Sequence, residues 1–384
     1  MDGSFALSAL GSLTFGAGTL DRLGELLVSQ HHGKVALVTS RTFSSTRRCD
    51  ELLRDLHARS ILCSVHPVSG EPSVTSVDSI ARSVHGDASD VVVGIGGGSA
   101  LDTAKAVAAM APLWAVSPRS DTVSVKRYLE GVGDLAPPPH RLPLIAIPTT
   151  AGTGSEATKN AVIAEIGPDG FKKSLRHDAY VPDHVIIDPT LAIGLPRQIS
   201  SASALDALTQ LLEAYTSINA NPYIDALALD AIGRVGNALR ALLEKGEDSV
   251  PLRSELAYGA YISGIALANA GLGYVHAIAG PLGALHHAPH GVICANLIEP
   301  VNRAMMEVAR DTVFLEKMER VSRLWGEGVV DRLGRLVRLA GLPRLGTFGY
   351  TAAELAAIGE KATGRTSPVT LKSEDIVRIL HGLY

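Results

Sequence analysis

The sequence predicts an α/β domain with a parallel sheet, followed by an all-helical domain. Short β-branched runs alternate with helical patterns as far as residue 188, whereas apolar residues recur at helical spacing from residue 202 onward. A chain of 384 residues is also too long for one compact core. We place the boundary so that residues 1–197 form the first domain and residues 198–384 form the second.

The strands of the first domain are predicted from apolar runs without polar alternation. Such runs are typical of parallel strands that are buried on both faces. The predicted strands are residues 34–39, 61–66, 91–95, 144–147 and 185–188. The polar stretch 117–143, which ends in APPPH, is expected to be a surface loop with some helix.

The helices of the second domain are predicted from the spacing of apolar residues. They are residues 202–215, 226–243, 256–268, 304–325 and 329–339. The stretch 256–285 carries no Asp, Glu, Lys or Arg, and a run of that length can span a bilayer. Glycines, Asn269 and Pro281 interrupt it, so we expect a buried helical hairpin.

The overall charge and the cysteines narrow the class of partner. Because 35 basic residues nearly balance 39 acidic ones, we expect a small-molecule ligand rather than nucleic acid or a membrane. The N-terminus lacks the basic region of a signal peptide. The sequence has three cysteines, Cys49, Cys63 and Cys294. Their odd number and the lack of CxxC spacing argue against disulfides and thiolate zinc sites, and so favour a location in the cytoplasm.

A glycine cluster follows the strand VVVGI and opens the helix GGGSALDTAKAVA. Gly96, Gly97 and Gly98 let the backbone approach a ligand, and Ser99 with Asp102 is predicted to cap the helix. The free N–H groups at such a helix start favour a phosphate. The alternative is a tight turn that binds nothing. Ser99 stands where a G-x-G-x-x-G motif has its last glycine, so the loop departs from that fingerprint.

A second glycine-rich loop, IPTTAGTGSEAT, follows the next strand. Its hydroxyl donors are Thr149, Thr150, Thr153 and Ser155. Loops after neighbouring parallel strands meet at the carboxyl ends of the sheet, where nucleotides bind. The two loops together therefore predict a nucleotide site.

Asp206, Gln210, His276 and His290 form a candidate metal site. Asp206 and Gln210 lie four residues apart on one predicted helix and share a face with apolar neighbours, so the carboxylate needs a partner. A cation that is also bound by imidazoles is one such partner. Each residue also has an alternative role. Asp206 could cap a helix together with Ser203, His276 could pack in the core, and His290 could lie at the C-terminus of a helix.

Four motifs, in this order, resemble the iron-containing (group III) alcohol dehydrogenase family. They are GIGGGSALDTAK, IPTTAGTGSEAT, DALTQLLEAY and GLGYVHAIAGPLGALHHAPHGVICA, and the similarity runs from TFGAGTLDRL to LKSEDIVRIL. The resemblance implies a dinucleotide-binding α/β domain, a helical domain, a catalytic metal between them and often a homodimer. The same fold occurs in glycerol dehydrogenase and dehydroquinate synthase.

The resemblance also implies which residues bind the metal. The family's metal aspartate falls on Asp206 and two of its metal histidines fall on His276 and His290, but Gln210 and Gly280 replace two active-site histidines. An amide is a poor ligand for Fe²⁺. Three ligands suffice in catalytic zinc sites, and glycerol dehydrogenase uses such an Asp, His, His set. We therefore expect a divalent metal, either iron or zinc.

Glycine at position 280 removes a group that handles protons and widens the pocket. Carbonyl reduction needs a Lewis acid, a hydride from the nicotinamide and a proton. His286 or His287 is expected to supply the proton, with water and ribose hydroxyls as the alternative route. Surface histidines without a role are the other interpretation of these two positions.

The coenzyme is expected to be NAD or NADP. Family members specific for NAD carry an aspartate at the end of the first strand, and Ser40 takes its place here beside Arg41. Arg41 is then either a contact for a 2′-phosphate or a solvated loop residue. Lys173 matches a family lysine near the nicotinamide ribose, with Lys172 as the alternative.

The expected activity is that of a metal-assisted NAD(P)-dependent alcohol dehydrogenase, or aldehyde or ketone reductase, acting on a small polar substrate. One alternative is a metal-free reductase similar to maleylacetate reductase, which Asp206 and the ending HGVICA disfavour. The other is a silent homologue that binds nucleotide without catalysis.

Overall fold

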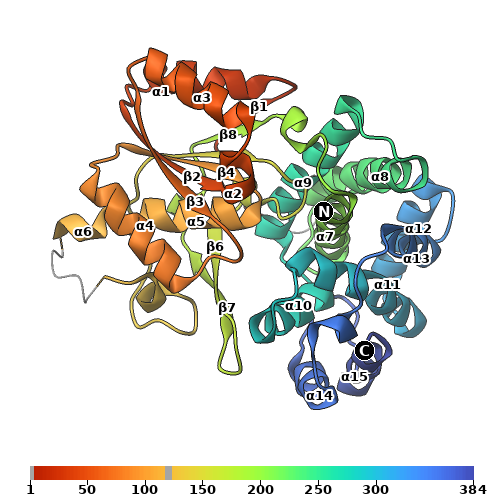
Figure 1. Ribbon diagram of the computed structural model, residues 1–384. Helices are drawn as coiled ribbons and strands as arrows, with labels where there is room; N and C mark the ends of the chain where they lie inside the picture. Colours follow the sequence, from red (N-terminus) through yellow and green to blue (C-terminus); the bar gives the residue numbers. More distant parts are fainter. Residues whose placement is uncertain (1–3, 117–122) are drawn as a thin grey trace.

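The computed structural model describes residues 4–116 and 123–384 and contains a parallel sheet of six strands (Figure 1). In spatial order the strands are β1 (Ser12–Phe15), β8 (His184–Ile187), β5 (Leu144–Pro148), β4 (Val91–Gly96), β2 (Lys34–Ser40) and β3 (Leu62–Val68). The register places Gly96 beside Pro148 and Thr39 beside Ile95. The ends of β2, β4 and β5 therefore share one edge of the sheet.

Alternate residues of the central strands point to the two faces of the sheet. Val91, Val93 and Ile95 pack in one apolar cluster and Val92 packs in the other. This double burial confirms the parallel sheet that the apolar runs predict. The helices that cover the faces are α1 (Leu23–Ser29) and α3 (Arg47–Ala58) on one side, and α4 (Val74–Gly86) and α5 (Gly98–Met110) on the other.

Two strands beside the sheet were not predicted. β6 (Asn160–Glu165) and β7 (Phe171–Arg176) form a separate antiparallel pair. The other strands were predicted from continuous apolar runs, and polar residues interrupt such runs in these two strands. Of the predicted loop 117–143, residues 117–122 lie outside the described residues, and the remainder contains the short helix η3 (Val125–Tyr128). Two further short helices are α2 (Arg41–Ser44) and α6 (Leu113–Val116).

The second half of the chain is helical, as predicted, and surrounds the buried helix α7 (Figure 1). The prediction of one helix over residues 304–325 is wrong, because one helix ends at Val308 and the next begins at Thr312. The Asp311 side chain caps the second helix by accepting from Phe314 N. The helices are α7 (Arg197–Thr216), α8 (Pro222–Lys245), α9 (Val250–Ala270), α10 (Tyr274–Leu285), α11 (His290–Val308), α12 (Thr312–Trp325), α13 (Val329–Ala340), α14 (Ala352–Lys361) and α15 (Ser373–Gly382).

The uncharged stretch folds into α9 and α10, which are bent by 101° and so do not form the expected hairpin. The left-handed backbone of Gly271, with φ of 77°, ends α9 and allows the sharp change of direction. Among the described residues no single helix is long and apolar enough to cross a membrane, and α9 with α10 meets that test only as this bent pair.

Candidate active site

A large cleft lies between the carboxyl edge of the sheet and the helices α7, α9, α10 and α11. Its volume is about 1360 Å³. Sites for single small ligands usually measure about 300–1000 Å³. The cleft therefore has room for a dinucleotide together with a small substrate.

The first glycine loop contributes the start of α5 to the cleft. Gly97 is the N-cap of this helix and no side chain caps it, so the predicted pairing of Ser99 with Asp102 as a cap is wrong. Gly97, Gly98 and Ser99 line the cleft. The uncapped N–H groups of the first turn remain available to a phosphate.

Asp102 joins the two glycine loops. Ser155 Oγ donates to Asp102 Oδ1 at 2.5 Å, and the backbone N–H of Val162 donates to Asp102 Oδ2 at 2.9 Å. Asp102 lines the cleft, but its oxygens are engaged by the protein. The carboxylate therefore positions the second loop and β6 against α5.

The second loop packs directly on the first one and on α9. A Cβ atom on Gly98 would lie 2.6 Å from Thr153 Oγ1. Gly154 has φ of 59°, and a Cβ atom there would lie 2.4 Å from the backbone nitrogen of Gly264. A side chain at Gly98 would push the two loops apart, and one at Gly154 would push the second loop away from α9.

The structure brings most of the predicted coenzyme residues to the cleft. Thr150, Thr153 and Ser155 line it, as do Ser40 and Arg41 at the end of β2. Gly96 and Thr149 are not among the lining residues, because they pair through their backbones at the end of the sheet: Thr149 N donates to Gly96 O at 2.9 Å.

Lys172, and not Lys173, faces the cleft. Lys172 Nζ lies 3.0 Å from Glu71 Oε1, and both residues line the cleft. Lys173 is exposed and lies on the side of β7 that faces Gly131. Successive residues of a strand point to opposite faces, so only one of the two lysines reaches the cleft. Of these two lysines, Lys172 is therefore the one that the structure places at the cleft.

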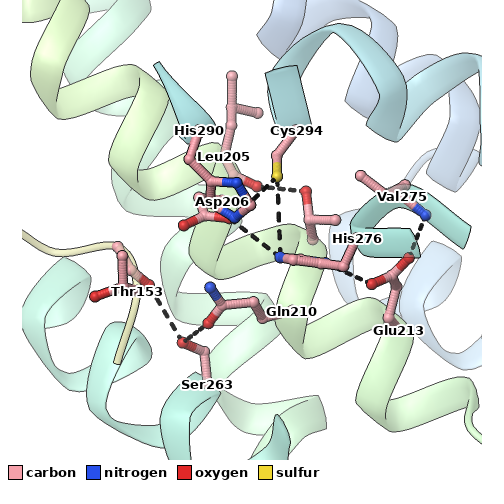
Figure 2. A network of polar contacts seen from close by, with 12 residues as sticks. Thr153, Leu205, Asp206, Gln210, Glu213, Ser263, Val275, His276, His290 and Cys294 are labelled. Atoms are coloured by element: carbon pink, nitrogen blue, oxygen red, sulfur yellow. Dashed lines mark hydrogen bonds and ion pairs between the residues drawn. The ribbon is translucent and has the colours of Figure 1, made fainter. Parts of the chain in front are cut away.

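The predicted metal residues come together with a cysteine that the sequence analysis did not include (Figure 2). Asp206 Oδ1 lies 3.4 Å from His276 Nε2 and 3.6 Å from His290 Nε2. Cys294 Sγ lies 3.6 Å from His290 Nε2 and 3.9 Å from His276 Nε2. The four ligand atoms lie within 4.8 Å of one another.

The alternative interpretations of Asp206 and His290 do not hold. Asp206 lies in the middle of α7 and caps nothing, and His290 begins α11 instead of ending a helix. His276, in the first turn of α10, is only partly buried and lines the cleft.

These donors fit a divalent cation. Asp206 is only 2% exposed, and its Oδ1 has no hydrogen-bond partner among the described residues. An unpaired buried carboxylate oxygen is costly, and a cation between Asp206 and the imidazoles removes that cost.

The pKa values of the three donors differ. Burial would raise the pKa of Asp206, but His290 and His276 beside it outweigh burial and lower that pKa to about 2. Burial lowers the pKa of His290 to about 4. Burial would also lower the pKa of His276, but Cys294 and Glu213 beside it outweigh burial and raise that pKa well above its ordinary value. At neutral pH Asp206 is therefore ionised and His290 is neutral, whereas a cation has to displace a proton from His276.

Glu213 orients His276 from behind and was missed by the sequence analysis. Its Oε2 lies 2.6 Å from His276 Nδ1, and its Oε1 accepts from the backbone N–H of Val275 at 2.7 Å. This contact fixes the ring so that Nε2 faces the cluster. Glu213 follows Asp206 by seven residues on α7, and that helical spacing could have revealed it.

Replacing Glu213 with glutamine is expected to weaken metal binding about 10- to 100-fold, because carboxylate partners behind metal-binding histidines contribute on that order. Titration of the metal-free protein with Zn²⁺ and with Fe²⁺ measures the effect. The matched control is Glu244→Gln on α8, where the carboxylate pairs with Arg240 and not with a histidine of the cluster. Equal affinities of Glu213→Gln and the wild type would refute the role.

Gln210 lines the cleft, but the protein engages its amide. Ser263 Oγ lies 2.7 Å from Gln210 Oε1, 2.7 Å from Ala260 O and 3.4 Å from Gly152 O. The contact ties α7 to α9 and to the second glycine loop (Figure 2). In this arrangement the amide oxygen of Gln210 faces Ser263 instead of the cluster.

Position 280 is open, and the two candidate proton donors differ. A Cβ atom on Gly280 would meet nothing within 4 Å. His287 is exposed and lines the cleft. His286 instead lies 3.3 Å from Glu354 Oε2 and meets the ring of Tyr350 edge-on at 4.6 Å. The structure therefore does not bring His286 to the cleft.

Two family models match the chain. The iron-containing alcohol dehydrogenase model matches residues 11–189, and the C-terminal model of the Fe-containing alcohol dehydrogenase family matches residues 200–384. The chain belongs to the iron-containing alcohol dehydrogenase family. Membership confirms the resemblance carried by the motifs.

Relatives of this family member include named enzymes. The chain is 34% identical over 340 residues to the probable alcohol dehydrogenase EutG of Escherichia coli (strain K12), which covers 87% of this chain and 82% of the relative. It is 30% identical over 388 residues to the lactaldehyde reductase of the same strain, with 96% of each covered. The solved structure of sulfoacetaldehyde reductase from Bifidobacterium kashiwanohense in complex with NAD⁺ is 25% identical, with a TM-score of 0.84 and coverage of 100% of this chain and 99% of that one.

This member of the iron-containing alcohol dehydrogenase family is an alcohol or aldehyde oxidoreductase. Its α/β domain and helical region match those of its solved neighbours. Family membership supports NAD(H) and a metal, typically iron, as cofactors, and a small molecule as substrate.

Proposed function

We propose that this enzyme is a metal-assisted NAD(P)-dependent dehydrogenase that interconverts small polar alcohols with their aldehydes or ketones. The observation that carries the proposal is the buried, unpartnered Oδ1 of Asp206 between two imidazoles at the cleft. Residues 1–197 serve as the dinucleotide-binding domain and residues 198–384 as the metal and substrate domain.

The side chains of the cleft divide the work. Asp206, His276 and His290 would hold the metal, which when bound supplies a Lewis acid for the substrate oxygen. Glu213 holds the ring of His276 by its Nδ1. The uncapped N–H groups in the first turn of α5 bind the coenzyme phosphates. His287 is exposed and lines the cleft. Its ring exchanges a proton with the substrate oxygen, and so replaces the family histidine whose position Gly280 occupies.

The walls of the cleft favour a polar substrate. Gly280 leaves open space, and the charged pair of Lys172 and Glu71 supplies hydrogen-bonding groups. Lactaldehyde and sulfoacetaldehyde, for which two relatives are named, are both small and polar. We infer the same substrate class for this chain.

Metal removal tests the proposed function. The purified enzyme is expected to contain about one metal per chain. Chelation is expected to abolish NAD(P)H oxidation with a panel of small hydroxy- and sulfo-substituted aldehydes, and Fe²⁺ or Zn²⁺ is expected to restore it. Full activity after complete chelation would favour a metal-free reductase. Nucleotide binding without any turnover would favour a silent homologue, and either result contradicts the proposal.

NADP is proposed as a coenzyme alongside NAD. Ser40 leaves the end of β2 without a carboxylate that would repel a 2′-phosphate, and the exposed Arg41 is adjacent. Ser40 Oγ accepts from Phe43 N at 3.2 Å, a role that aspartate also fills.

Replacing Ser40 with aspartate is therefore expected to preserve the fold and to lower kcat/KM with NADPH relative to NADH at least about tenfold, through charge repulsion. Steady-state kinetics with both coenzymes measure the ratio. Ser45→Asp adds the same charge at an exposed position nearby and serves as the control. An unchanged ratio in Ser40→Asp would exclude the 2′-phosphate from this end of β2.

We also propose a cytoplasmic homodimer. β1 is an edge strand, and several apolar side chains on it and before it are exposed, which favours pairing with a second copy. The exposed apolar residues are Phe5, Leu7, Leu10, Leu13 and Phe15. The three cysteines are unpaired, which suits a reducing compartment. Sedimentation equilibrium tests the dimer, and a monomer at micromolar concentration contradicts it.

A further inference from the structure

We propose that Cys294 binds the metal as a fourth protein ligand, in place of the histidine that Gln210 replaces, and makes the site selective for zinc over iron. This inference rests on the metal site of the proposed function and assigns its composition.

The position of Cys294 points its sulfur at the cluster. It lies four residues after His290 on α11, so the two side chains share one face of that helix. Cys294 is fully buried, and its Sγ contacts the Nε2 atoms of His290 and His276 (Figure 2). The other two cysteines, Cys49 and Cys63, lie in the sheet domain.

The printed distances suit a cation among the four donor atoms. With Zn–S near 2.3 Å and Zn–N or Zn–O near 2.0–2.1 Å, tetrahedral geometry separates nitrogen from oxygen by about 3.3 Å and sulfur from nitrogen by about 3.6 Å. Asp206 Oδ1 lies 3.4 and 3.6 Å from the two imidazole nitrogens. Cys294 Sγ lies 3.6 and 3.9 Å from the same nitrogens. These four separations are within a few tenths of an ångström of the expected ones, and all four atoms lie within 4.8 Å of one another.

Gln210 does not compete for this place. Its amide oxygen lies 2.7 Å from Ser263 Oγ and faces α9. The unpartnered oxygen of the cluster is Oδ1 of Asp206, which is nine-tenths or more buried and faces the same space as the sulfur. Cys294 therefore brings the protein donors back to four, the number that the family pattern has with its histidine at position 210.

A thiolate changes the preferred metal. One carboxylate and one thiolate together balance the charge of a divalent ion in a buried site, whereas a carboxylate with a neutral amide leaves it half balanced. A soft sulfur ligand favours Zn²⁺ over Fe²⁺. The general order of divalent-metal affinities for protein sites also places Zn²⁺ above Fe²⁺. On binding, the thiol proton leaves to the buffer as the metal–sulfur bond forms.

Cobalt substitution tests the inference with a spectroscopic signal. The metal-free enzyme loaded with Co²⁺ is expected to show a sulfur-to-cobalt charge-transfer band in the near ultraviolet. Cys294→Ser is expected to lose the band and to raise the Kd for Zn²⁺ at least about 100-fold, more than the loss of an outer partner. Cys63→Ser, the matched control, is expected to keep both. Competition between equal Zn²⁺ and Fe²⁺ is expected to load zinc in the wild type and less of it in Cys294→Ser.

The outcomes separate this inference from the proposed function. One cobalt per chain without the band, or a band that survives in Cys294→Ser, would overturn the role of Cys294 and leave the metal-assisted activity standing. A folded wild type that binds no metal would overturn both. If Cys294→Ser does not fold, X-ray absorption of the zinc-loaded wild type decides instead, because a sulfur ligand lies about 2.3 Å from zinc.

Discussion

Replacing Asp206 with asparagine is expected to empty the metal site and to lower kcat/KM about 1000-fold or more. The carboxylate lies between His276 and His290, and its Oδ1 forms no hydrogen bond among the described residues. Without the metal, the charge that develops on the substrate oxygen loses its main stabilisation. Elemental analysis and steady-state kinetics measure the two effects.

The stability of the same variant separates chemistry from folding. Asparagine has nearly the shape of aspartate, so the packing of α7 is retained. In the metal-free state the imidazoles outweigh burial and lower the pKa of Asp206, so the folded protein favours the ionised carboxylate. The substitution is therefore expected to lower the free energy of unfolding at neutral pH without preventing folding. Asp230→Asn, on the exposed face of α8, is the control. Full metal occupancy in Asp206→Asn would refute the site.

Replacing Gly98 with valine is expected to weaken NAD(H) binding at least about 100-fold, which corresponds to about 2.7 kcal/mol. A Cβ atom there would lie 2.6 Å from Thr153 Oγ1, so the new side chain displaces the second loop and blocks the start of α5. Fluorescence titration with NADH measures the affinity.

Gly86→Val, at the end of α4, is the matched control because a Cβ atom there meets nothing within 4 Å. Metal content is expected to remain unchanged in Gly98→Val, since the cluster residues come from α7, α10 and α11. Wild-type affinity for NADH in Gly98→Val would show that coenzyme does not approach this loop.

The sequence predicts those parts of the molecule whose residues carry a strong local signal. Glycine clusters after buried strands predict the two loops, because few residues other than glycine tolerate such close packing. Asp206 stands out on an apolar helix because a buried carboxylate requires a partner. Lys172 and Lys173 could not be separated, since a shift of one residue in an unpredicted strand exchanges the faces.

Cys294 and Glu213 were missed for different reasons. The spacing of the cysteines from one another gives no signal for Cys294. The signal lies in its distance from His290, which precedes it by four residues on α11. Glu213 was hidden because its partner, His276, lies on another helix and only the fold joins them. His286 and His287 are adjacent in sequence, but the end of α10 turns them toward different neighbours.

The contact between Gly154 and Gly264 brings two backbones together with no side chain between them. A displacement of the second loop would therefore be transmitted directly to α9. Ser263 on α9 contacts Gln210, which lies four residues after Asp206 on α7. By thermodynamic reciprocity, any change that coenzyme makes in the affinity for metal equals the change that metal makes in the affinity for coenzyme.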